Sequence, residues 1–191
     1  MQSKHLQFAP LVSLALFVIG ITLVFTFTSP EKIVEHIGIE NGYLFLFIIS
    51  FIAGVSTFTS VPYQVVLITL AAGGLNPFLL GLTAAVGDML GDTTSYFLGY
   101  YGRTLLPQNG QWIQMKIQTV ADRHPRLLPL VFFLYGATAP ISNDVLTIPF
   151  GIARYPFFYL MIPLGLGNIV YNTTLAYFGV QIFAFLGSLF S

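Results

Sequence analysis

The chain has 191 residues, of which 55% are hydrophobic and only 7% are charged, and its formal net charge is zero. An ordinary soluble domain carries about 25% charged residues, so this composition indicates a bilayer as the solvent and argues against nucleic acid as a partner. The sequence contains no cysteine, which excludes disulfides, thiolate chemistry and cysteine metal sites.

The first apolar run covers residues 8–28 and is 21 residues long. It exceeds the roughly 7–15 residues of a signal-peptide core, so we predict a retained transmembrane helix. The polar segment at 29–42 carries three glutamates and one lysine, whereas Lys4 precedes the first helix. The positive-inside rule therefore predicts a cytoplasmic N-terminus and an external 29–42 segment.

The next sixty residues are expected to cross the membrane an odd number of times, because the basic 103–126 segment that follows them is predicted to be cytoplasmic. Three full spans would leave no room for turns. Pro62, which follows several hydroxyl residues, interrupts the apolar stretch and removes a helix donor. We therefore predict a re-entrant hairpin with legs at 43–58 and 62–74, followed by one span at 77–101.

The second half of the chain repeats the motifs of the first. The segment PYQVVLITLAAG corresponds to PISNDVLTIPFG, and DTTSYFLG corresponds to NTTLAYFG further along. One span per repeat inverts the second copy, so the two hairpins are expected to enter from opposite faces and to meet near the midplane. The alternative is that Pro and Gly only kink ordinary membrane helices. The residues assigned to the hairpin tips are Pro62, Gly73, Pro140 and Gly151.

These patterns predict an all-α polytopic membrane protein with about three full transmembrane helices and an inverted repeat of two opposed re-entrant hairpins. The stretch QNGQWIQMKIQTVADRHPR is predicted to form a short amphipathic helix on the inner face. The predicted units are an N-terminal helix and polar segment at 1–42 and a membrane domain at 43–187, divided into repeat one at 43–102, a cytoplasmic segment at 103–126 and repeat two at 127–187.

The motifs SVPYQVVLITLAAGGLNP, GDMLGDTTSYFLGYYGR and APISNDVLTIPFGIARYPF resemble the DedA family, also called the VTT-domain or SNARE-associated Golgi protein family, over roughly residues 43–180. The resemblance implies two opposed re-entrant hairpins and a role in moving lipids across membranes. Family members are implicated as polyprenyl-phosphate carriers in bacteria and as phospholipid scramblases in eukaryotes. Gln64 stands where the better-known bacterial members carry an acid, and Ala137 and Asn143 stand where they carry arginines.

Asp88 and Asp92 lie one helical turn apart within an apolar stretch and share one face of the predicted helix. A charged aspartate at the bilayer centre costs about 2.5–3.5 kcal/mol, which makes both residues functional candidates. We expect them to face the space between the hairpin tips with Asp144 nearby, where repulsion keeps at least one carboxyl protonated near neutral pH. The structural alternative is that they accept hydrogen bonds from backbone N–H groups freed at a hairpin tip.

The other candidates lie on the two hairpins. Asp144 and Asn143 are good N-cap types, so each is either a helix cap or a contact for a proton or headgroup. Gln64 is the expected counterpart of Asp144 in the first hairpin. Arg154 lies at the exit of the second hairpin, where it either snorkels to the interface or pairs with a lipid phosphate. The residues predicted for a substrate or proton path are Asp88, Asp92, Asp144, Gln64, Asn143 and Arg154.

The sequence therefore predicts a membrane transporter or scramblase that moves a lipid or lipid-linked anion between leaflets, with protons as a candidate coupling ion. The alternatives are an ion-coupled transporter of a small solute and a non-transporting membrane scaffold. No catalytic triad pattern, phosphate-cradling loop or metal-ligand spacing occurs, so we expect no enzyme activity, cofactor or metal. The expected location is the plasma (inner) membrane of a prokaryote, with membrane lipids as partners and homo-oligomerisation left open.

Overall fold

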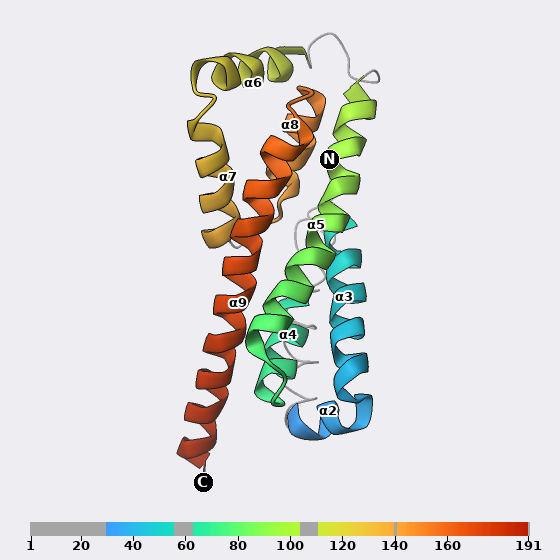
Figure 1. The fold of residues 1–191 in the computed structure, drawn as a ribbon, viewed down its shortest axis with the longest axis vertical. Coiled ribbons are helices and arrows are strands. Elements are labelled where there is room, and N and C mark those ends of the chain that lie inside the picture. The colour runs from blue at the N-terminus through green and yellow to red at the C-terminus, as the bar shows by residue number, and fades with distance from the viewer. Residues whose placement is uncertain (1–29, 56–62, 104–110, 140, 191) are drawn as a thin grey trace, which may run out of the picture.

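The computed structural model describes residues 30–55, 63–103, 111–139 and 141–190 (Figure 1). Every regular element within these ranges is a helix, which confirms the all-α prediction. None of the helices in these ranges has both the length and the hydropathy needed to cross a bilayer. The predicted helix at 8–28 and both hairpin prolines, Pro62 and Pro140, lie outside the described residues. The helices are α2 (Pro30–Ile37), α3 (Ile39–Val55), α4 (Tyr63–Ala72), α5 (Pro77–Gly102), α6 (Gln111–Arg123), α7 (Leu127–Thr138), α8 (Asp144–Ile152) and α9 (Phe157–Phe190).

The long helices α5 and α9 form the centre of the bundle and run in opposite directions (Figure 1). α5 begins where the sequence supplies a strong start signal. The side chain of Asn76 accepts hydrogen bonds from the backbone N–H groups of Phe78 and Leu79 at 3.0 and 3.1 Å, and proline occupies the first turn. The two helices touch where Gly81 meets the backbone of Thr173.

Glycines allow each central helix to approach one shorter helix closely. α3 packs along α5, and a Cβ atom on Gly54 would lie 3.0 Å from the Cα atom of Gly91. α7 packs along α9 in the same way, since a Cβ atom on Gly167 would lie 2.9 Å from the carbonyl carbon of Gly136. Both halves of the molecule therefore use the same kind of close helix pair.

The short helices α4 and α8 pack against the central helix of the opposite half. Gly99 of α5 meets the backbone of Ile148 in α8, and Gly179 of α9 meets the side chain of Ile68 in α4. α4 and α8 occupy opposite halves of the bundle, and each begins near the middle (Figure 1). The N-terminal ends of α4 and α8 therefore lie near the middle of the bundle, and their C-terminal ends point towards its two opposite ends.

Two of the glycines assigned to the hairpin tips lie elsewhere. Gly73 directly follows the last residue of α4, and Gly151 lies in the last turn of α8. Both therefore mark the outer ends of the short helices, and their assignment to the tips is wrong. Gly151 instead serves helix packing, because it sits against the backbone of Tyr96 in α5.

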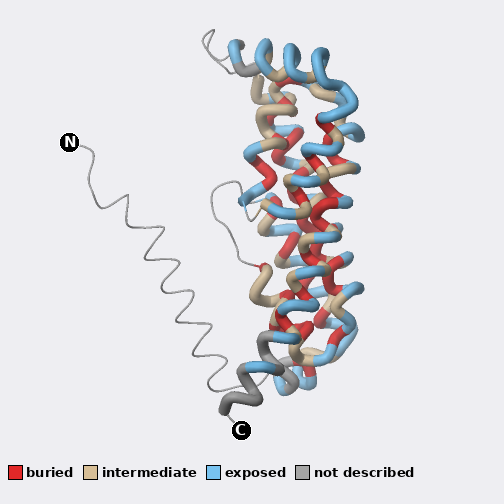
Figure 2. The backbone as a smooth tube through the Cα atoms, turned by 90° about the vertical axis from the view of Figure 1, so that its left-hand side faces the viewer, coloured by how far each residue is buried: buried red, intermediate tan, exposed pale blue. Residues whose placement is uncertain are grey.

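The amphipathic helix predicted within the 103–126 segment is present as α6, which lies across one end of the bundle (Figure 1). It packs on the end of α8, where Gln118 donates a hydrogen bond to the carbonyl oxygen of Ala153 at 3.5 Å. Buried residues follow the inner sides of the helices along the whole bundle (Figure 2). They form two apolar clusters, one centred on α3, α4 and the first half of α5, and one centred on α7 and the start of α9.

Candidate functional site

Asp88 and Asp92 are buried at the middle of α5, with 8% and 2% of their surface exposed. A single side-chain amide connects them. The Nδ2 atom of Asn143, which directly precedes α8, donates to the Oδ2 atom of Asp92 at 2.6 Å and to that of Asp88 at 3.3 Å. The two carboxyls therefore share one donor and face the start of α8 inside the protein.

The opposite central helix supplies a second donor. Asn168 of α9 donates from its Nδ2 atom to the Oδ2 atom of Asp88 at 3.2 Å. Asn172, one turn further along, donates to the backbone oxygen of Asn168 at 2.9 Å, and the buried Tyr63 at the start of α4 lies beside it. Residues from α4, α5, α8 and α9 thus converge at one level of the bundle.

Asp144 is the third buried acid of this cluster. Its Oδ2 atom accepts a hydrogen bond from the Ser142 hydroxyl at 2.9 Å, whereas its Oδ1 atom has no hydrogen-bond partner. Tyr135 of α7 donates its hydroxyl to the backbone oxygen of Ser142 at 2.9 Å and so closes this side of the cluster. We call Asp88, Asp92, Asp144, Asn143 and Asn168 the acid cluster.

The hydrogen bonds decide whether Asn143 caps α8 and whether Asp88 and Asp92 accept from backbone N–H groups. Asn143 occupies the N-cap position of α8, but its side chain makes no cap hydrogen bond and binds Asp88 and Asp92 instead. Among the described residues, the hydrogen bonds to these two aspartates come from side-chain amides, not from freed backbone N–H groups. The carboxyls are therefore held by neutral groups that could be exchanged for a ligand.

Two predicted site residues are not part of the acid cluster. Arg154 lies beyond the end of α8, is exposed and places its guanidinium 4.8 Å from the centre of the Tyr100 ring. Its backbone is left-handed, with φ of 55°. Gln64 is half-buried in the first turn of α4, and no hydrogen bond joins it to the three aspartates within the described part of the chain.

The sequence contained a signal for Asn168 that the repeat analysis missed. GDMLGD, which ends at Asp92, aligns with GNIVYN, which ends at Asn172, when the repeat is extended by one helical turn. Asn168 then corresponds to Asp88, and all four residues are buried. One central helix therefore presents two carboxyls where the other presents two carboxamides, of which Asn168 donates to Asp88 and Asn172 donates to the backbone oxygen of Asn168.

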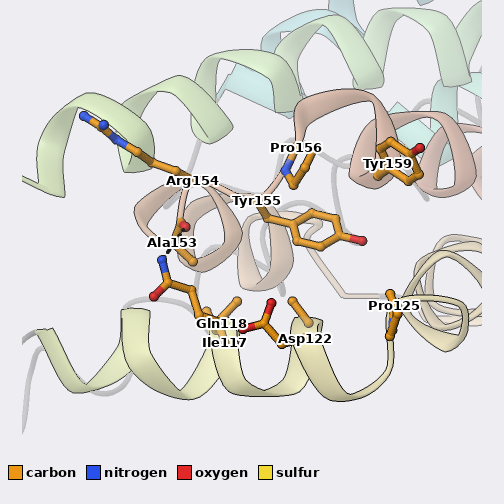
Figure 3. A pocket seen from close by; sticks show the side chains of 10 residues that line it. Ile117, Gln118, Asp122, Pro125, Ala153, Arg154, Tyr155, Pro156 and Tyr159 are labelled. Carbon is orange, nitrogen blue, oxygen red and sulfur yellow. Dashed lines mark hydrogen bonds between the residues drawn. The ribbon is translucent and has the colours of Figure 1, made fainter.

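A separate pocket of about 360 Å³ lies between α6 and the turn that joins α8 to α9 (Figure 3). The ring of Tyr155 lies across it above Asp122, and the side chain of Arg154 points away from it. Its walls also include Gln118 and Tyr159. This pocket lies at the α6 end of the bundle and not at the acid cluster.

Comparisons of the chain with protein-family models, with curated proteins and with solved structures each found no match. The chemistry and position of the acid cluster are therefore the basis for assigning a function.

Proposed function

We propose that the chain is a membrane protein that moves a lipid or a lipid-linked anion between bilayer leaflets without covalent chemistry. In this proposal α3 with α4 and α7 with α8 are the re-entrant hairpins of an inverted repeat. We assign the full spans to the predicted helix at 8–28 and to α5 and α9, which in this proposal cross as parts of the packed bundle, since neither has by itself the length and hydropathy of a lone transmembrane helix. The observation that carries the proposal is that Tyr63, at the start of α4, and Asn143, directly before α8, both lie beside the buried Asp88 and Asp92.

Opposed half-helices that begin at mid-depth, next to a polar site, are a recurrent transporter architecture. Non-helical backbone is tolerated at that depth only where protein or a watery cavity surrounds it. The acid cluster supplies such a polar surrounding, with two amide donors and three carboxyls drawn from α5, α8 and α9. The resemblance of the hairpin and span motifs to the DedA family points in the same direction.

The outer surface of the bundle supports a lipid environment. Leu44 of α3, Leu98 of α5 and Phe158 of α9 are each more than half exposed. The carboxyls of Asp88 and Asp92 in α5, in contrast, are turned towards groups next to α8 and on α9. Large exposed apolar surfaces on a protein usually mark contact with another apolar phase, which in this proposal is the lipid interior.

The acid cluster gives the proposed pathway its chemistry. The amides of Asn143 and Asn168 can donate to a headgroup in place of the carboxyls they now contact. Ionised carboxyls in the buried acid cluster repel an anion, so each must take up a proton before an anionic headgroup passes. Release of that proton afterwards would couple movement to a proton gradient.

Flux of fluorescent lipids across reconstituted vesicles tests the proposal. Asp88→Asn and Asp92→Asn are expected to abolish flux or its dependence on pH, while both variants still fold and insert. Glu40→Gln is the matched control, because Glu40 is an exposed acid of α3 far from the cluster in sequence. The proposal is wrong if the parent moves no lipid, or if both cluster variants move lipid as the parent does with the same pH dependence.

A further inference from the structure

Among the buried side-chain oxygen atoms that have no hydrogen-bond partner within the described ranges, three belong to α5 and α8. They are the Oγ atom of Ser95, the Oγ1 atom of Thr147 and the Oδ1 atom of Asp144. Ser95 is 1% exposed, Thr147 is fully buried and Asp144 is 8% exposed. Buried hydroxyl and carboxyl oxygens are paired in the large majority of cases, so three unpaired ones on two packed helices call for a further partner, either water or an ion.

These groups lie on segments of α5 and α8 that pack against each other. Ser95 follows Asp92 by three residues in α5, and Thr147 follows Asp144 by three residues in α8, so each pair shares a helix face. The two helices are joined where these pairs begin, since Asn143, the residue before Asp144, donates a hydrogen bond to Asp92. About two turns further on, the backbones of both helices are in contact at Gly99 and Ile148.

The donor set consists of two carboxylates and two hydroxyls, and all of its donor atoms are oxygen. Oxygen donors select hard cations over the softer metals that prefer nitrogen or sulfur. A divalent ion is disfavoured, because no group of three or more His, Cys, Asp or Glu in the described ranges has metal-holding geometry. A monovalent ion needs less negative charge around it and accepts neutral hydroxyl ligands.

We propose that Asp92, Ser95, Asp144 and Thr147 form a sodium ion site between α5 and α8. Sodium at this position would use the unpaired oxygens as ligands and would offset part of the negative charge of the acid cluster. The site is independent of lipid movement, because it rests on the packing of α5 against α8 alone. If lipid movement is also shown, sodium becomes a second coupling ion beside the proton.

Thermal unfolding of the purified full-length chain tests the site without any lipid readout. The unfolding midpoint is measured in sodium, potassium and choline chloride at equal ionic strength. Sodium is expected to raise it in a saturable manner, with the folding equilibrium shifting about tenfold at a sodium concentration ten times its dissociation constant. Equal midpoints in all three salts would overturn the proposal and would indicate that water satisfies these oxygens.

Matched variants locate the effect. Ser95→Ala and Thr147→Val remove one hydroxyl each with little change of volume, and both are expected to lose the sodium response. Thr173→Val is the control, because its Oγ1 atom is also buried and unpaired but lies where α5 crosses α9. Retention of the response by both hydroxyl variants refutes the site. If either hydroxyl variant fails to fold, Asp144→Asn replaces it in the test. This variant is also expected to lose the sodium-dependent rise of the unfolding midpoint, and its retention of that rise refutes the site.

Discussion

Replacing Asn143 by alanine removes a side chain that joins the start of α8 to both buried carboxyls of α5. The short bond to Asp92, at 2.6 Å, contributes about 1.5–3 kcal/mol when that carboxyl is ionised, which is the range for hydrogen bonds to charged groups. The longer contact with Asp88, at 3.3 Å, adds less, and Asp88 keeps a second donor in Asn168. We therefore expect Asn143→Ala to lower the free energy of unfolding by about 2–4 kcal/mol.

Thermal unfolding of the purified protein measures this loss, which corresponds to a drop in the midpoint of roughly 4–16 °C for a chain of this size. Asn41→Ala is the control. Its side-chain amide also donates a hydrogen bond, in this case to the backbone carbonyl of Ile37 at 2.8 Å and at an exposed position. That variant is expected to change the free energy of unfolding by no more than about 0.5 kcal/mol.

A double-mutant cycle separates the bond from the general cost of losing a side chain. In an Asp92→Asn background, Asn143→Ala is expected to cost less than in the parent, with a coupling energy of about 1–3 kcal/mol. The reasoning is refuted if Asn143→Ala leaves the midpoint unchanged, or if its cost is the same in both backgrounds. Either outcome would mean that Asn143 does not hold the acid cluster together.

Two further predictions concern the packing and the orientation of the helices. Gly54→Ala is expected to lower the free energy of unfolding by about 1–3 kcal/mol, because the new methyl group would meet the backbone of α5. Gly102→Ala is the control, since a methyl group at Gly102 would meet open space, and it should leave the free energy of unfolding unchanged. Single cysteines at Glu40 and Gln111, in a chain with no cysteine of its own, are expected to label from opposite sides of the membrane. Labelling from the same side would exclude the proposed membrane arrangement.

Local sequence signals were sufficient for most of the helices. Asn76 and proline start α5 as expected from capping chemistry, and the predicted span at 77–101 corresponds to Pro77–Gly102. The second leg predicted at 62–74 corresponds to α4, and the amphipathic pattern of the 103–126 segment corresponds to α6. The short helix α2 was not predicted, since the polar segment that contains it was interpreted only through its charge.

The sequence by itself determined that Asp88 and Asp92 share a face, because their spacing matches the helical period. It did not determine what that face meets. Asn143 and Asn168 lie 51 and 80 residues from the aspartates they contact, and Arg154 lies only ten residues after Asp144 yet stacks on Tyr100 outside the cluster. Periodicity specifies the direction of a side chain from its own helix axis. The partner that it reaches depends on which helices pack together. In this protein glycines permit close backbone contact between helices that are distant in the sequence.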